Sequence, residues 1–197
     1  MNNNKIKNSN FIANYEAFLQ KSPTSFIYFK VSRNTPEKAR IPRCRINIFE
    51  AFVTKDINKK IIPTAHYINI YNLDLANKIL ETYKKVIPEN KEQFIVLSQS
   101  IPHTDNMTVL ARIPLFEHNA IIEELIISLI NTEKYPFAID IRTFMTRPNF
   151  VGWTPQGIRF PLDKSTDFIN FFSTAISKLS ELISQINNLP NNKSINK

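Results

Sequence analysis

The chain has 197 residues, and its 25 Lys and Arg against 17 Asp and Glu give a formal net charge of +8. Hydrophobic residues make up 43% of the sequence, which excludes a disordered chain and allows a sizeable core. The positive charge favours a polyanionic partner such as nucleic acid, an acidic membrane surface or an acidic protein. Asn, Ile and Lys are abundant, as in proteins from AT-rich genomes, so the placement of the charge is more informative than its total.

Cysteine content and hydrophobic runs indicate where the protein works. Cys44 is the single cysteine, so no intramolecular disulfide can form. No apolar run approaches the ~18–20 residues that cross a membrane, and the N-terminus lacks the apolar core of a secretion signal. We therefore expect an intracellular protein, in the cytoplasm or nucleus, without membrane association.

The first half of the chain predicts a small sheet followed by a helix. Residues 1–20 are expected to form a flexible N-terminal segment. Alternating apolar and polar residues, rich in aromatic and β-branched types, then predict strands at 26–32, 44–53 and 66–71. Asn72 or Asp74 can cap an amphipathic helix over 73–86.

The second half shows a similar order of elements. Alternation predicts strands at 93–99, 107–113, 136–145 and 157–161, and a loop over 148–155. Apolar residues at helical spacing predict helices over 117–131 and about 164–186. The tail, 188–197, is polar and is expected to be disordered.

Two segments of the sequence can be aligned with each other, each with the order of a β-sheet-plus-helix unit. Ile46 and Ile48 then match Ile139 and Ile141, and the pair at 68 and 70 matches Ile158 and Phe160. The sequence thus predicts an α+β fold of two pseudo-repeated antiparallel units, 21–90 and 91–187, with helix 117–131 inserted in the second. The alternative is that an α+β chain shows the order β-β-α twice by chance.

The predicted strands have one apolar face and one face where aromatic and basic side chains interleave. The residues expected on the apolar, packed face are Ile27, Phe29, Val31, Ile46, Ile48, Ile68, Ile70, Ile139, Ile141, Ile158 and Phe160. Aromatic rings stack on unpaired bases, and Arg or Lys neutralise the phosphates between them. The same residue types also suit a protein interface or two-sided burial, so three interpretations stay open. The residues of this mixed face are Tyr28, Lys30, Arg45, Asn47, Phe49, Tyr67, Asn69, Tyr71, Arg112, Arg142, Phe144 and Arg159.

Two further features lie outside the regular strands. Lys38, Arg40, Arg43 and Arg45 form the densest basic stretch, which is either a solvated loop or an arm that contacts phosphates. Trp153 lies between prolines, where it either packs a loop onto the sheet edge or stacks on a base.

The residues of common catalytic and metal sites are scattered. His66, His103 and His118 have no second ligand at metal spacing, and Cys44 has no nearby His. The chain has only two glycines, which excludes a glycine-rich phosphate loop, and it lacks the converging carboxylates of a nuclease. We predict no enzymatic activity, no cofactor and no metal site.

The second predicted unit resembles a known family. The Ile-Asp-Ile-Arg stretch at 139–142 and the Gly-Ile-Arg-Phe stretch at 157–160, followed by a capped helix, are similar to the C-terminal domain of the transcriptional coactivator positive cofactor four. The related Whirly proteins have two such units in one chain and bind single-stranded DNA, or sometimes RNA, on a curved antiparallel sheet. The resemblance covers about 45 residues well and implies binding residues at Arg45, Phe49, Tyr67, Arg142, Phe144 and Arg159.

The chain departs from that family in three places. Helix 117–131 is an insertion, and the lysine-rich stretch before the second strand is only partly present. The first unit has His66 and Tyr67 where the second has Gln156 and Gly157. These differences put the strand order and the ligand in question.

Together these features predict a non-catalytic protein that binds single-stranded nucleic acid, DNA before RNA, in transcription, replication or genome maintenance. Partners would include the transcription or replication machinery and a second copy of the chain. The alternative is a protein-interaction module, such as a polymerase accessory factor or virion component, that binds no nucleic acid. The expected binding residues are Tyr28, Lys30, Arg43, Arg45, Phe49, Tyr67, Tyr71, Arg142, Phe144, Trp153 and Arg159.

Overall fold

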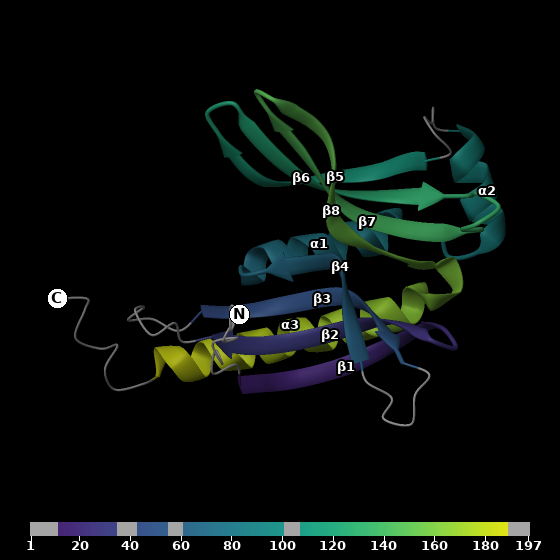
Figure 1. Cartoon of the computed structure of the whole chain (residues 1–197). Coiled ribbons are helices and arrows are strands. Elements are labelled where there is room, and N and C mark those ends of the chain that lie inside the picture. Colours follow the sequence, from purple (N-terminus) through teal and green to yellow (C-terminus); the bar gives the residue numbers. More distant parts are fainter. Residues whose placement is uncertain (1–11, 35–42, 55–60, 101–106, 189–197) are drawn as a thin grey trace, which may run out of the picture.

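A computed structural model describes residues 12–34, 43–54, 61–100 and 107–188. They form an α+β fold of two four-stranded antiparallel sheets and three α-helices (Figure 1). The N-terminal sheet has the order β1-β2-β3-β4 and the C-terminal sheet the order β5-β6-β7-β8. The strands are β1 (Ile12–Ser22), β2 (Ser25–Asn34), β3 (Arg43–Val53), β4 (Ile61–Ile70), β5 (Met107–His118), β6 (Ile121–Ile130), β7 (Ala138–Arg147) and β8 (Phe150–Pro161).

Helices follow each sheet. After β4, the Asn72 side chain accepts hydrogen bonds from the N–H groups of Asp74 and Leu75 and so begins α1 (Leu73–Val86). A second helix, α2 (Lys91–Ser100), follows directly. After β8, a short 3-10 turn leads into α3 (Ser165–Asn187). The helices predicted at 73–86 and about 164–186 are confirmed.

The alternation of the strands places their apolar residues in the core as predicted. All eleven strand residues expected on the packed face are buried. On the β3–β4 hairpin Ile46 pairs with Ile70, and on the β7–β8 hairpin Ile139 pairs with Phe160. Both hairpins carry a register shift three residues further along, after Phe49 and after Arg142. The two sheets therefore share strand order, core positions and the place of an irregularity.

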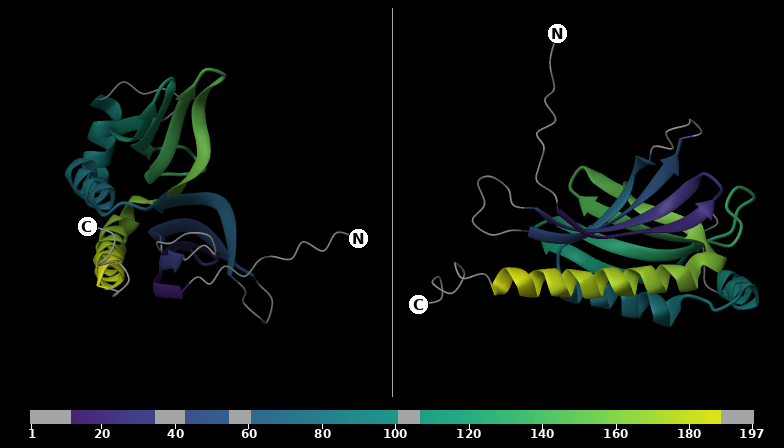
Figure 2. Two further views of the ribbon diagram at one scale, coloured as in Figure 1. Left: turned by 90° about the vertical axis from the view of Figure 1, so that its left-hand side faces the viewer. Right: turned by 90° about the horizontal axis from the view of Figure 1, so that it is seen from below.

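Helices α1 and α3 each contact the sheet of the other half of the chain. The last helix, α3, follows the C-terminal sheet but packs along β1, β2 and β3, where Phe168 and Phe171 contact Phe29. Helix α1 follows the N-terminal sheet but contacts β5 as well as β4. The stacked rings of Phe160 and Phe168, 4.7 Å apart, join the two halves in one core. The helices lie together on one side of the sheets (Figure 2), so no helix of the described residues covers the opposite, outer face of the N-terminal sheet.

The predicted helix over 117–131 is wrong. The structure has the end of β5, a tight turn with Asn119 at φ 53°, and the strand β6. Six consecutive residues of β6, from Leu125 to Ile130, are buried, because β6 lies inside the sheet and is covered on both faces. Such a strand is apolar throughout, so its residues also satisfy a helical spacing.

Three other expectations need correction. The segment 93–99 is not a strand but part of α2, which begins where the Asn90 side chain accepts the Gln93 N–H at 2.9 Å. Strand β1 lies mostly within the predicted flexible segment. The predicted loop over 148–155 is the tight β7–β8 hairpin, so Trp153 lies on a strand. Residues 1–11 and 189–197 lie outside the described residues.

Candidate nucleic-acid interface

Four aromatic side chains cross the outer face of the N-terminal sheet in one row. Strand register places Phe18 beside Tyr28, Tyr28 beside Phe49, and Phe49 beside Tyr67, one residue from each strand. The rings of Phe18 and Tyr28 lie 4.5 Å apart, and the edge contact between Tyr28 and Phe49 spans 4.6 Å between centroids. We call these four residues the aromatic row. Its rings face away from α3, because Phe29, next to Tyr28, points into the core.

Polar and cationic side chains lie next to the aromatic row. Register places Glu16, Lys30, Asn47 and Asn69 side by side across the same four strands. Lys30 forms an ion pair with Glu16 at 3.2 Å, and the Asn47 amide donates to Asn69 at 2.6 Å. One further step along the sheet, Arg45 donates to the hydroxyl of Tyr71 at 3.5 Å.

The sheet is hollowed between these two rows. A depression of about 410 Å³ is lined by Lys30, Arg45, Asn47, Phe49, Tyr67 and Asn69, together with Ser32, Pro63 and Thr64. Both charged side chains in this lining are cations, and the others are aromatic, amide, hydroxyl or proline groups. The depression therefore combines positive charge, hydrogen-bonding amides and partly exposed rings.

The members of the aromatic row are not equally accessible. Tyr28 is only 7% exposed, because Phe18 and Phe49 cover its ring, and burial together with a hydrogen bond to Glu16 raises its pKa. Phe18 is 43% exposed. Phe18 falls in the segment predicted to be flexible and was therefore not expected at the site; in the structure residues 15, 17 and 19 are partly or fully buried, whereas 16 and 18 are exposed.

The predicted site residues of the second half lie on the C-terminal sheet. Arg142 and Arg159 both bind the fully buried carboxylate of Asp140, Arg142 through two contacts of 3.1 and 3.2 Å and Arg159 through one of 2.8 Å. Phe144 and Trp153 pack edge to face at 5.2 Å. The structure therefore divides the expected residues between two faces rather than gathering them on one.

Corresponding positions of the two sheets differ in charge. Asn47 and Asn69 of the N-terminal sheet match Asp140 and Arg159 of the C-terminal sheet in register. An amide pair thus stands where the other sheet has an ion pair. Each sheet sets two cations against one carboxylate, because Glu16 pairs with Lys30 as Asp140 pairs with Arg142 and Arg159. The difference lies in the surroundings, since Lys30 and Arg45 line a depression beside partly exposed rings and amides. The N-terminal sheet is therefore the stronger candidate for binding an anion.

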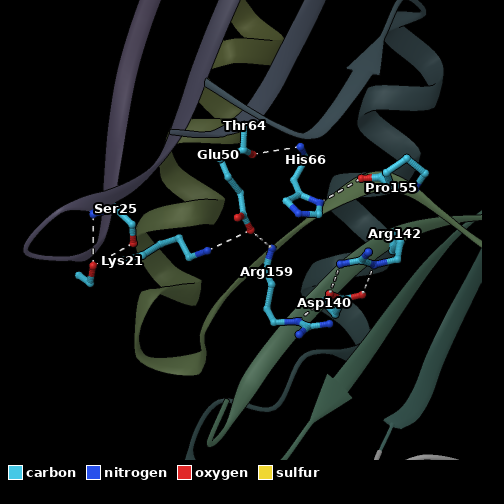
Figure 3. A network of polar contacts seen from close by, with 10 residues as sticks. Lys21, Ser25, Glu50, Thr64, His66, Asp140, Arg142, Pro155 and Arg159 are labelled. Carbon is cyan, nitrogen blue, oxygen red and sulfur yellow. Dashed lines mark hydrogen bonds and ion pairs between the residues drawn. The ribbon is translucent and has the colours of Figure 1, made fainter. Parts of the chain in front are cut away.

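Polar contacts hold the two sheets in a fixed relation. The Glu50 carboxylate of β3 accepts from Lys21 at 3.0 Å and from the backbone N–H of Arg159 at 2.9 Å (Figure 3). The ring of His66 on β4 also contacts the Pro155 carbonyl at 3.2 Å, across the junction between β4 and β8. These contacts join strands far apart in the sequence and fix the relative position of the two outer faces.

Several expectations fall outside these surfaces. Arg43 begins β3, but its side chain lies outside the described part, as do Lys38, Arg40 and His103. Cys44 is buried, and burial raises the pKa of its thiol.

In the described ranges, no three His, Cys, Asp or Glu side chains gather as a metal site. The helices of those ranges are too short or too polar to cross a membrane.

Comparison with models of known protein families gives no match, and neither does comparison with curated protein sequences. The function must therefore be argued from the geometry of this chain.

Proposed function

We propose that this protein binds single-stranded nucleic acid, without catalysis, on the outer face of the N-terminal sheet. The observation that carries the proposal is the aromatic row beside a depression whose charged lining residues, Lys30 and Arg45, are cations. Bases of a single strand would stack on Phe18, Phe49 and Tyr67, and Tyr28 would support the rings on either side of it. Tyr71, which is 55% exposed, extends this surface beside Arg45.

Charge and stacking have separate roles in this proposal. On the same face of the sheet, Lys30 lies two residues along β2 from Tyr28, and Arg45 lies four residues along β3 from Phe49. From these positions both can contact the phosphates that follow a stacked base. Each contact releases condensed counterions, so binding weakens as salt rises. Stacking needs exposed base faces, which a duplex hides, so the surface favours single strands.

The amides offer a means of reading bases. Asn69 accepts from Asn47, and both side chains line the depression. Amide groups can donate to and accept from the edges of unpaired bases. DNA is the expected ligand, with RNA as the other arm of the test, and the function would lie inside the cell in transcription, replication or genome maintenance.

We also place the two sheets in a coactivator-like or Whirly-like arrangement of two related units. Their common strand order, paired core positions and matching register shifts support a pseudo-repeat. Because α1 and α3 each pack against the sheet of the other half of the chain, the two units share one hydrophobic core. This assignment rests on the geometry of this chain and on the short resemblance at 139–142 and 157–160.

The test is a titration of labelled single-stranded DNA, and of RNA of the same sequence, at low and moderate salt, with the matching duplex as control. We expect salt-sensitive binding that prefers the single strand. Lys30→Ala with Arg45→Ala should lower the salt slope by about 1.4, at roughly 0.7 per phosphate contact. Arg142→Ala should change it less, because Arg142 lies on the C-terminal sheet and does not line the depression. Absence of binding at low salt, or preference for the duplex, would refute the proposal.

A protein-interaction module is the second candidate. It is favoured by exposed apolar side chains at the hairpin ends of the C-terminal sheet: Phe116, Ile121, Ile122 and Val151. Clusters of this kind mark contact surfaces for proteins. If the oligonucleotide titration fails while Ile122→Asp and Val151→Asp disrupt self-association in sedimentation experiments, this function replaces the first.

A further inference from the structure

A second hollow lies where the two sheets meet, away from the aromatic row. It is enclosed by the β1–β2 turn, the end of β3, the loop between β6 and β7, and the end of β8, and its volume is about 490 Å³. Ligand pockets commonly fall between about 300 and 1,000 Å³. This inter-sheet hollow shares no lining residue with the depression on the N-terminal sheet.

The walls of the inter-sheet hollow offer rings for stacking. Phe52 is 49% exposed and Tyr135 is 37% exposed, and both line it beside Pro136 and Pro161. Large apolar side chains that stay exposed inside a hollow are available to a ligand in a way that core residues are not. A planar, partly apolar ligand fits such walls.

The charged side chains of the hollow favour an anion. Its lining contains three cations, Lys21, Lys134 and Arg159, and one carboxylate, Glu50. That carboxylate already accepts from Lys21 and from the backbone of Arg159. Lys134 lies 5.2 Å from the centre of the Tyr135 ring, and the Arg159 guanidinium lies 4.5 Å from it. Asp140 binds the Arg159 guanidinium at 2.8 Å and offsets part of its charge, so Lys134 contributes most to the positive charge beside the Tyr135 ring.

Hydrogen bonds within the protein hold the walls of the hollow in place. Glu50 fixes β3 against β8 at its edge (Figure 3). In the loop, the backbones of Thr132 and Tyr135 bond each other at 3.1 and 3.2 Å. The loop ends at Phe137, whose φ of 47° is rare for a residue with a side chain. The N–H of Leu162 donates a hydrogen bond of 2.8 Å to the carbonyl of Phe137. Strained backbone of this kind gathers at ligand sites.

We propose that the inter-sheet hollow binds a nucleotide. The base lies against Phe52, and the phosphate lies near Lys134 and Arg159, whose cations lie over the Tyr135 ring. Serine hydroxyls at 22 and 25, also in the lining, can bond the sugar. The nucleotide is either free or the terminal nucleotide of a strand, since both present the same base and phosphate.

Calorimetric titration of the full chain tests this proposal with AMP, UMP, adenosine and inorganic phosphate. We expect a mononucleotide to bind at least about ten-fold more tightly than adenosine or phosphate, because the hollow contacts both parts. Lys134→Ala and Phe52→Ala should each weaken nucleotide binding about five-fold or more. Lys178→Ala and Phe150→Ala, the same changes on α3 and at the β7–β8 turn, should leave it unchanged.

Competition separates the two sources of nucleotide. A 5′-phosphorylated single strand that displaces AMP identifies a strand end as a ligand, and failure to displace it identifies a free nucleotide. The proposal is overturned if no mononucleotide binds at millimolar concentration, if phosphate alone binds as tightly, or if Lys134→Ala and Phe52→Ala bind like the wild type. Since Lys134 lies outside the aromatic row, these outcomes are independent of single-strand binding on the N-terminal sheet.

Discussion

Replacing Phe49 by Ala removes the central accessible ring of the aromatic row. Phe49 lies between Tyr28 and Tyr67 in register, and it is partly exposed beside the depression. A base stacked on such a ring contributes roughly 1–3 kcal/mol, so the Kd for a single strand should rise about 5- to 160-fold. No charge is lost, so the slope of log affinity against log salt should stay the same.

The same change costs some stability, and this cost can be separated from binding. Phe49→Ala loses its edge contact with Tyr28, which is worth about 0.5–1.5 kcal/mol beyond area burial. The variant should therefore stay folded, with a moderately lower midpoint in urea. Fluorescence anisotropy at several salt concentrations measures both affinity and slope.

Phe150→Ala is the matched control, because it removes a partly buried ring on the β7–β8 turn. Equal affinities for wild type and Phe49→Ala, or equal losses for Phe49→Ala and Phe150→Ala, would refute the role of the aromatic row.

Four more variants test the fold and the surface. Gly157→Ala would place a Cβ within 2.8–2.9 Å of the backbone of β7, so it should lower the free energy of unfolding in urea by about 1–3 kcal/mol. As a control, Gly152→Ala meets no atom closer than 3.5 Å and should leave that free energy nearly unchanged. Burial raises the pKa of Tyr83, so its neutral form stabilises the fold below pH about 10, and this contribution is lost as the pH rises further. The melting temperature of the wild type should therefore fall above that pH, and Tyr83→Phe should reduce this fall. Glu16→Gln frees the Lys30 ammonium for phosphate and should tighten single-strand binding up to about five-fold, which equal anisotropy curves would contradict.

The sequence predicts well what depends on local alternation. Ile27, Phe29, Ile46 and Ile48 were placed in the core because a strand turns every second side chain to one face, and the structure confirms them. Asn72 or Asp74 was expected to cap α1, because either side chain can accept backbone N–H groups, and in the structure Asn72 does so.

Features that depend on neighbours distant in sequence could not be predicted in this way. Strand β6 is buried on both faces, which removes the alternation that marks a strand. The apolar stripe of α3 does not indicate which sheet it covers. The shared ion pairs of Asp140 depend on the register of β7 against β8, which sets Arg159 directly opposite it.

Photo-crosslinking tests the central claim most directly. A single strand containing 5-iodouracil is bound to the full chain and irradiated, and the crosslinked peptides are identified by mass spectrometry. We predict crosslinks at Phe18, Phe49 and Tyr67, on the outer face of the N-terminal sheet, and their loss at high salt. Crosslinks confined to α3 or to the C-terminal sheet, with none on the aromatic row, would contradict the account.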